Sequence, residues 1–269
     1  MLRIAQTDWR PAQASALTEL PRPIHFRAYE LARGTHVEAH THPWCHFLYA
    51  RSGVMQIRAG ASRSLLPPFH GMWIPAGTAH EAWILEDVAL ESLFIDPQQL
   101  EAPRQGCQVV QIDEFARAFI HHANRVTPEH YDAQGREGRM LAVLLDVLEA
   151  LPATAFSLPC PSEPRLAAMC DAIQRSPGDA HRQKDWADAL HMSPRTFARR
   201  FQDETGLTFS QWRQRLRLQQ AVVLLESGQG VTQAALELGY NSPSAFTHAF
   251  ATLFGMTPSQ FLQKQNDDA

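Results

Sequence analysis

The sequence predicts two domains: an all-β N-terminal barrel followed by α-helices, and an all-α C-terminal domain. Three observations lead to this prediction. Short segments rich in β-branched and aromatic residues fill 24–96, with Gly and Pro between them. From about residue 111 the apolar residues recur at three- and four-residue steps. Further along, the chain contains an internal repeat, and its 269 residues suit two domains of about 100–200 residues better than one.

The expected strands of the first domain are short. They are FLYA (47–50), VMQIRA (54–59), MWIPA (72–76) and ALESLFI (89–95). Many short strands at near-regular spacing indicate a barrel or a sandwich.

Two amphipathic helices are expected after the barrel, over 112–126 and 136–151. The second has a wide apolar face, which must pack on the barrel or on another subunit. The segment 152–164 has four prolines and no periodicity, so we expect a linker there. The predicted domains are therefore 1–151 and 165–269.

The repeat has a period of 49 residues. It aligns Ser193-Pro194 with Ser242-Pro243, Phe197 with Phe246, Phe201 with Phe250 and Gly206 with Gly255. Each copy has a short helix, a tight turn and a second helix that opens with Ser as N-cap and Pro at the first helical position. This order predicts two helix-turn-helix units, joined by one long helix over 209–227.

The exposed face of each second helix is the candidate DNA-reading surface. With Phe197 and Phe201 buried, Arg195 and Arg199 project together, and arginine can donate bidentately to guanine in the major groove. In the second unit Ser244, Thr247 and His248 are left exposed. They suit phosphate or permissive contacts.

The net charge of −4 is unevenly distributed. Residues 165–264 contain 11 basic and 8 acidic side chains, which leaves 13 basic and 20 acidic side chains elsewhere. Because charges are screened within about 10 Å at 0.1 M salt, the local excess matters more than the sum. The acidic total therefore does not exclude a nucleic-acid partner.

The stretches SPRTFARRFQDETGLTFSQWRQRLRLQQAVVLLESG and ALELGYNSPSAFTHAFATLFGMTPSQF closely resemble the AraC/XylS family of bacterial transcription regulators, over about residues 165–262. The resemblance implies a C-terminal DNA-binding domain and an N-terminal domain that binds an effector and forms a homodimer. It places Arg195 and Arg199 at base-contacting positions and puts Pro243, Ser244, Thr247 and His248 on the second recognition helix. The implied partners are a double-stranded DNA operator and, for an activator, RNA polymerase.

A histidine cluster is the second candidate site. Seven of the 13 histidines lie between His25 and His80. On a strand, His40 and His42 would share one face, and His46 would return to the site on the next strand. With His80, these positions resemble the two metal motifs of the cupin fold, with His46 where a Glu is common. Imidazole suits Ni, Zn, Co, Cu, Fe and Mn, and His40, His42, His46 and His80 are the predicted ligands.

Three functions remain open at this point. The first is a regulator that senses a transition metal, and the second is the same architecture responding to a small organic effector. The third, a metal-dependent cupin enzyme fused to a DNA-binding domain, is disfavoured because no further acid–base pair is dedicated to chemistry. The sequence thus predicts a regulator and not an enzyme.

A cytoplasmic location is expected. No run approaches the roughly 18 apolar residues that cross a bilayer, and the N-terminus lacks an apolar signal core of about 7–15 residues. The cysteines Cys45, Cys107, Cys160 and Cys170 form no C-x-x-C pair, which suits reduced thiols.

Overall fold

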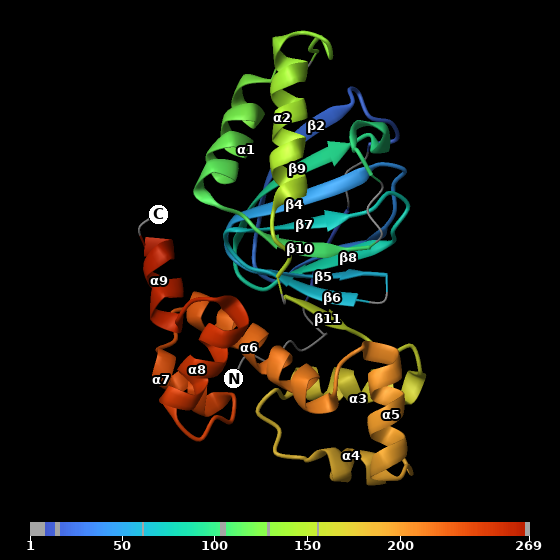
Figure 1. Cartoon of the computed structure of the whole chain (residues 1–269), viewed down its shortest axis with the longest axis vertical. Helices are drawn as coiled ribbons and strands as arrows, with labels where there is room; N and C mark the ends of the chain where they lie inside the picture. The colour runs from blue at the N-terminus through green and yellow to red at the C-terminus, as the bar shows by residue number, and fades with distance from the viewer. Residues whose placement is uncertain are drawn as a thin grey trace. The chain divides into compact units, whose positions relative to one another are not determined.

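The computed structural model describes residues 9–13, 17–60, 62–102, 106–127, 130–154 and 156–266 (Figure 1). The chain forms two compact units, one of residues 9–60 and 64–154 and one of residues 156–266. The ends of the predicted domains, 1–8 and 267–269, lie outside the described residues. In the part of the chain that is described, no helix is long and apolar enough to cross a membrane.

The N-terminal unit is built on two β-sheets. One sheet runs in the order β1–β3–β8–β5–β6, with β1 parallel to β3 and the pairs β3–β8 and β5–β8 antiparallel. Its strands are β1 (Arg10–Ala12), β3 (Thr35–His40), β8 (His80–Ile84), β5 (Met55–Ala59) and β6 (Ser62–Leu66).

The other sheet is antiparallel throughout and runs in the order β10–β7–β4–β9–β2. Its strands are β10 (Gln108–Gln111), β7 (His70–Ile74), β4 (Cys45–Ser52), β9 (Val88–Ile95) and β2 (Ile24–Leu31), and the short helix η1 (Pro97–Gln99) follows β9. The predicted strands over 47–50, 54–59, 72–76 and 89–95 all fall within or across these elements.

Along the central strands, successive side chains point alternately into the core under the helices and into a cavity between the sheets. On β4, Phe47 and Tyr49 pack into the core shared with the helices, whereas His46 and Leu48 line a cavity between the sheets. All eight residues of β9 are buried, as expected for a strand covered on both faces. A strand of this kind carries the site on one face and the core on the other.

The helices α1 (Glu114–Val126) and α2 (Arg136–Ala150) lie at 114–150, in agreement with the sequence prediction, and Figure 1 shows them beside β2, β9 and β4. Their apolar faces share one core with the second sheet. Its members include Phe47, Trp73, Leu93, Ile95, Ile120, Leu141, Leu144 and Leu148. The wide apolar face of α2 therefore packs on its own sheet, at least in part.

Gly71 on β7 is required by this packing. A Cβ at this position would lie 2.3 Å from Cζ of the Phe47 ring, which is too close for any side chain. Phe47 lies on the neighbouring strand β4 and is fully buried. The absent side chain thus leaves space for a core aromatic ring.

Within the predicted linker 152–164, the structure has ordered elements. Strand β11 (Ser157–Pro159) places Leu158 in the core of the C-terminal unit, and Phe156 stacks on Phe254 at 4.4 Å between ring centroids. The indole Nε1 of Trp212 donates to the carbonyl of Pro159 at 2.8 Å. Two apolar side chains among the prolines explain why this stretch is extended and packed.

The C-terminal unit is helical and duplicated. Its helices are α3 (Pro164–Arg175), α4 (Gln183–Ala189), α5 (Pro194–Thr205), α6 (Phe209–Glu226), α7 (Val231–Glu237), α8 (Pro243–Phe254) and α9 (Pro258–Asn266). The pairs α4–α5 and α7–α8 are the two expected helix-turn-helix units, and α6 is the expected long helix between them.

The caps repeat as the sequence repeat requires. Ser193 and Ser242 each accept a hydrogen bond from the backbone N–H three residues later, at 3.2 Å in both cases. Both recognition helices end at a left-handed glycine, Gly206 with φ 70° and Gly255 with φ 73°. The two copies share their boundaries as well as their sequence.

Candidate functional site

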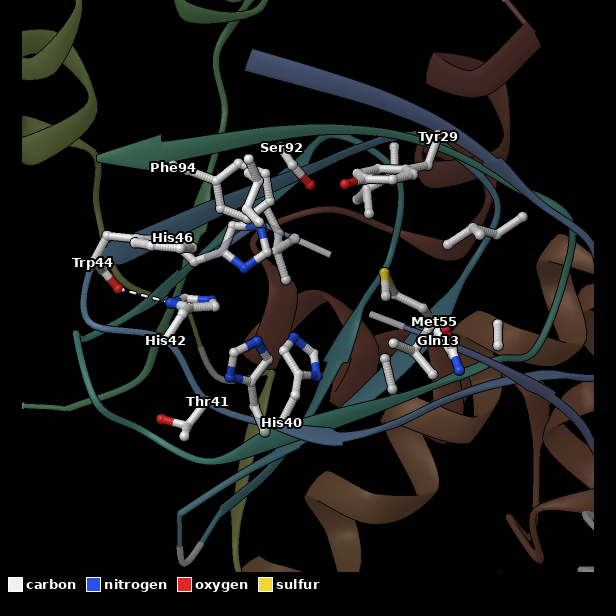
Figure 2. Close-up of a pocket in the computed structure, with 18 residues that line it drawn as sticks. Gln13, Tyr29, His40, Thr41, His42, Trp44, His46, Met55, Ser92 and Phe94 are labelled. Atoms are coloured by element: carbon white, nitrogen blue, oxygen red, sulfur yellow. Dashed lines mark hydrogen bonds between the residues drawn. The ribbon is translucent and has the colours of Figure 1, made fainter. Parts of the chain in front are cut away.

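The histidine cluster lies in a cavity of about 150 Å³ between the two sheets of the N-terminal unit (Figure 2). One sheet contributes His40 and His80, and the other contributes His46 on β4. His42 comes from the short connection between β3 and β4. Four imidazoles separated by up to 40 positions in the chain are thus brought to one site.

Three of the imidazoles are held in one tautomer by local backbone carbonyls. Nδ1 of His40, His42 and His80 lies 2.9 Å from the carbonyl oxygens of Glu38, Trp44 and Thr78, in that order. A carbonyl only accepts, so each Nδ1 carries the proton and Nε2 keeps its lone pair. In metal sites this arrangement fixes the ring and raises the basicity of the ligating nitrogen.

The available nitrogens face one another. One ring nitrogen from each of His40, His42 and His80 lies within 4.8 Å of the other two. Ring centroids are 4.2 Å apart for His40 and His80 and 5.0 Å apart for His42 and His80. Nε2 of His42 and of His80 is buried and has no hydrogen-bond partner within the described residues. Buried nitrogens without partners are costly unless something else binds them.

His46 completes the cluster from the opposite sheet. Its ring centroid lies 5.4 Å from that of His42 and 5.8 Å from that of His80. Both of its ring nitrogens are buried and neither has a partner in the described part of the chain. The ring stacks on Phe94 at 4.4 Å.

Burial favours the neutral form of His42, His46 and His80 by lowering the pKa of each. The pKa of His80 is lowered to about 4, mainly by burial and also by the neighbouring His40 and His42, while the hydrogen bond to the Thr78 carbonyl opposes the shift. Burial is also the main reason why the pKa of His42 is lowered and that of His46 lies well below its usual value. Neutral imidazole is the form that can ligate a metal.

The structure groups ring nitrogens of three predicted ligands, His40, His42 and His80, within 4.8 Å of one another, and the His46 ring lies beside this group but not in it. One step of the prediction was wrong. His40 and His42 do not share a strand face, because β3 ends at His40 and Pro43 follows within three residues. His42 reaches the site from the connection instead, with its ring parallel to Trp44 at 5.1 Å.

The neighbouring histidines and tryptophans lie elsewhere, except for Trp44. His36 contacts Glu81 at 2.9 Å and stacks on Trp83, while Nδ1 of His70 lies 2.8 Å from the Pro68 carbonyl. Trp44 lines the cavity, and Trp73 is part of the core under the helices.

The remaining wall of the cavity was not predicted. It is mainly apolar and includes Leu31, Val37, Leu48, Met55, Ala82, Leu90 and Phe94, with Tyr29, Gln13 and Ser92 among the polar members. The hydroxyl of Ser92 is fully buried and has no partner within the described residues. The period of two along the strand at 88–95 could have placed Leu90, Ser92 and Phe94 on one face. It could not have shown which of the two faces the helices cover.

The second site is the exposed face of α5. Arg195 and Arg199 are exposed, and Phe197 and Phe201 of the same helix are fully buried. The predicted division of this helix into a buried and an exposed face is therefore present.

Helix α8 has the matching arrangement with different side chains. Phe246 and Phe250 are fully buried. Pro243, Ser244 and His248 are exposed, and Thr247 is half-buried. The hydroxyl of Thr252 donates to the backbone carbonyl of His248 at 2.8 Å.

Comparison with known proteins identifies this arrangement. A helix-turn-helix domain family matches residues 186–264. The transcriptional regulator NimR of Escherichia coli is 31% identical over 226 residues, which cover 84% of this chain and 82% of NimR. The chain belongs to the AraC-type transcriptional regulators. It is a DNA-binding regulator with an N-terminal effector domain.

Other AraC-type comparisons cover less of the chain or are less close. RipA of Corynebacterium glutamicum, also named as a helix-turn-helix regulator, is 31% identical over 40% of this chain and 32% of its own length. Among solved structures, ToxT of Vibrio cholerae aligns with 90% of this chain and 97% of its own, with a TM-score of 0.38 and 11% identity.

Proposed function

We propose that this AraC-type regulator senses a transition-metal ion through His40, His42, His46 and His80 and that the ion controls operator binding. The observation that carries the proposal is the convergence of ring nitrogens from His40, His42 and His80, beside the buried ring of His46. Nε2 of His42, Nε2 of His80 and both ring nitrogens of His46 are buried and have no partner within the described residues. Packing alone gives no reason to leave buried imidazole nitrogens without partners.

The donor set fits a borderline metal. Imidazole nitrogens suit Zn, Cu, Fe, Ni and similar borderline ions, and availability and geometry select among them. His40, His42 and His80 would supply Nε2, since their Nδ1 atoms donate to carbonyls, and His46 would supply either ring nitrogen. The bound ion would supply positive charge and fixed coordination and perform no reaction.

Control of DNA binding follows from linkage. An ion that binds one conformation of the effector domain better than another shifts the population toward the first. Gln13 and Leu17, which follow β1, line the same cavity as the histidines. These two side chains are therefore candidates for the part that responds to the ion.

The test is metal analysis of the full-length protein. The metal-free protein is titrated with Ni, Co, Zn, Cu and Mn, and bound metal and operator affinity are measured together. We expect about one ion per chain and a change of operator affinity of about 5–150-fold, the usual range of allosteric coupling. His42→Ala with His80→Ala should abolish both effects.

The matched control is His122→Ala, which removes an exposed histidine from α1. It should behave as the wild type. If the double variant keeps both its metal content and its response, the sensor proposal is wrong.

A second candidate function has its own observation in favour. The cavity wall is mainly apolar around Leu31, Leu48, Met55 and Leu90, and the buried hydroxyl of Ser92 has no partner within the described residues. Such a lining suits a small organic effector, with the histidines as hydrogen-bonding groups. If the metal titration changes nothing but Met55→Trp, which fills the cavity, abolishes regulation in cells, this alternative is favoured.

We also propose the DNA-contacting residues. Arg195 and Arg199 on α5 would donate to base edges in one major-groove segment. On α8, Pro243, Ser244, Thr247 and His248 would approach the next segment and make weaker contacts to bases or phosphates. RNA polymerase would be a further partner if the protein activates, and the site of action would be the cytoplasm.

A homodimer is the proposed assembly. Exposed apolar side chains lie on both helices of the effector domain: Phe115 is 63% exposed, Val126 45% and Val143 50%. Exposed apolar patches of this kind mark interaction surfaces. Phe115→Asp with Val143→Asp should convert a dimer to a monomer in sedimentation experiments, whereas Glu137→Gln on α2 should not.

A further inference from the structure

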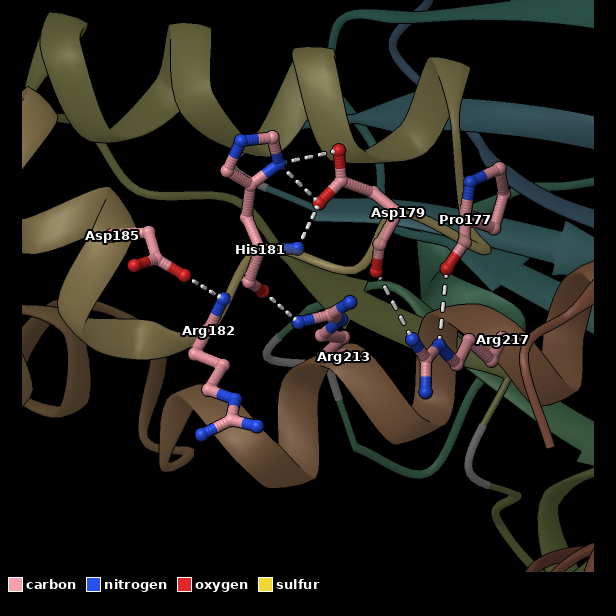
Figure 3. Close-up of polar contacts among 7 residues, drawn as sticks. All are labelled: Pro177, Asp179, His181, Arg182, Asp185, Arg213 and Arg217. Carbon is pink, nitrogen blue, oxygen red and sulfur yellow. Dashed lines mark hydrogen bonds and ion pairs between the residues drawn. The ribbon is translucent and has the colours of Figure 1, made fainter. Parts of the chain in front are cut away.

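The loop 176–182 between α3 and α4 is fastened to the middle of α6 by two arginines (Figure 3). Arg217 donates from Nε to the carbonyl of Pro177 at 3.0 Å and from Nη2 to the carbonyl of Asp179 at 3.2 Å. Arg213, one turn earlier, donates from Nη1 to the carbonyl of His181. The two carbonyls bound by Arg217 flank Gly178.

The same loop touches the second helix-turn-helix unit. A Cβ placed on Gly178 would lie 2.4 Å from the carbonyl oxygen of Glu237, the last residue of α7. A Cβ on Gly239, in the turn between α7 and α8, would lie 3.5 Å from both Arg217 Nη2 and the Gly178 carbonyl oxygen. Arg217 therefore lies where a loop that precedes the first unit meets the turn of the second.

This contact is a second connection between the two units. The first is α6 itself, whose 18 residues extend about 27 Å. A single helix fixes a distance, but its two ends can twist or bend relative to each other. Two recognition helices that enter successive major-groove segments must hold a separation of about 34–36 Å and a defined rotation.

We propose that Arg217 and Gly178 are positioning residues that set the spacing of DNA subsites this regulator accepts. Arg217 holds the loop, and the missing side chain of Gly178 lets the loop reach the carbonyl of Glu237. The inference rests on the proposed function of α5 and α8 as a pair of DNA-reading helices. In this role Arg217 acts through its hydrogen bonds to the loop, and its guanidinium group does not need to contact DNA.

The probe is a duplex that the full-length protein selects from a pool of random sequences about 30 base pairs long. A second duplex has one base pair inserted between the two protected segments, which rotates one of them by about 35°. We expect the wild type to bind the selected duplex at least tenfold more tightly than the inserted one, because one set of base contacts is lost. In Arg217→Ala and Gly178→Ala we expect this ratio to fall to about threefold or less.

Gly230→Ala is the matched control. Gly230 is in the same unit, and a Cβ there would meet nothing within 4 Å. Neither Gly178 nor Gly230 has a positive φ, so alanine is free of backbone strain at both. Because Gly230 is the N-cap of α7, where alanine is less favourable than glycine, its variant also controls for a small loss of stability in this unit. Gly230→Ala should keep the wild-type ratio.

Three results would overturn the inference. Gly178→Ala and Arg217→Ala could both retain the wild-type ratio. Arg217→Ala could reduce the slope of log affinity against log salt concentration by about one, which would show that Arg217 contacts a phosphate. Both duplexes could be weakened equally in parallel with a lower melting temperature, which would reveal a general loss of stability. If the protein selects no duplex, the proposed DNA reading fails with the inference, whereas an unchanged ratio on a selected duplex refutes the inference alone.

Discussion

At the scale of single residues, the histidine cluster depends on hydrogen bonds that span only two positions. His40 and His80 each donate to the carbonyl two residues before them, and His42 donates to the carbonyl two residues after it. The tautomer of each ring is therefore decided by its own segment. The two sheets then bring the Nε2 atoms of these rings close to one another.

The first prediction concerns the stability of the protein at low pH. Burial lowers the pKa of His80 to about 4, whereas the unfolded chain has the ordinary value of about 6.5. The unfolded state thus binds the proton first, and stability falls as the pH drops from about 6.5 toward about 4. The loss from His80 alone is about 3 kcal/mol, and His42 and His46 add to it in the same direction.

Urea unfolding of the metal-free protein at several pH values measures this effect. His80→Gln should lose less stability between pH 7 and pH 4 than the wild type, by up to about 3 kcal/mol. His122→Gln, at an exposed position, should follow the wild type. Parallel curves for His80→Gln and the wild type would show that His80 is not held neutral.

The second prediction concerns DNA. Arg195→Ala and Arg199→Ala should each reduce discrimination between the selected duplex and random DNA by about tenfold or more, because a good bidentate contact is worth about 1–3 kcal/mol. Arg200, also exposed on α5, lies on a different side of the helix. Arg200→Ala should weaken binding to both duplexes by the same factor in a fluorescence assay. Unchanged discrimination in the double variant Arg195→Ala with Arg199→Ala would remove the proposed base contacts.

At the scale of elements, the sequence was most informative where two signals coincide. Both helix-turn-helix units could be predicted because Ser-Pro caps, paired Phe residues and terminal Gly recur at one period. The strands over 24–96 were predicted by composition and turns. The predicted placement of His42 on a strand was wrong because β3 ends at His40, before the turn at Pro43. The alternation of apolar and polar residues does not show where a strand ends.

The cavity wall and the loop at Gly178 were missed for a different reason. Both depend on residues far apart in the sequence, since Gly178 lies against Glu237, and Met55 and Phe94 line one cavity. Local periodicity describes which face of an element is apolar but not its partner. The same limit kept Phe156 and Leu158 from being recognised as core residues.

The third prediction tests the duplicated caps. Ser193→Ala and Ser242→Ala each remove a hydrogen bond to a backbone N–H in the first turn of a recognition helix and should cost about 1 kcal/mol of unfolding free energy. Urea denaturation measures the loss. Ser210→Ala, at an exposed position inside α6, should leave stability unchanged or slightly higher. Equal stability of all three variants would contradict the role of the caps.

At the scale of the whole molecule, the two units differ in chemistry. The C-terminal unit has a small basic excess, and the rest of the chain has the acidic excess and most of the histidines. The small net charge of the DNA-binding part gives little bulk attraction to phosphates, so specific contacts must supply more of the affinity.

The fourth prediction follows from linkage between the units. If a metal ion changes operator affinity by some factor, operator DNA must change metal affinity by the same factor. Metal titrations with and without the selected duplex measure it. His42→Ala with His80→Ala should remove the effect in both directions. Coupling observed in one direction only would mean that the two measurements do not report one equilibrium.

The duplication of the DNA-binding unit has a consequence for the orientation of the regulator. The two copies share caps, buried Phe pairs and terminal glycines, yet one presents arginines and the other presents Ser, Thr and His. If both copies read DNA, a single chain reads a site whose two halves differ, and such a site has a direction. A promoter that contains it therefore specifies which end of the protein faces the start of transcription, without the help of a second chain.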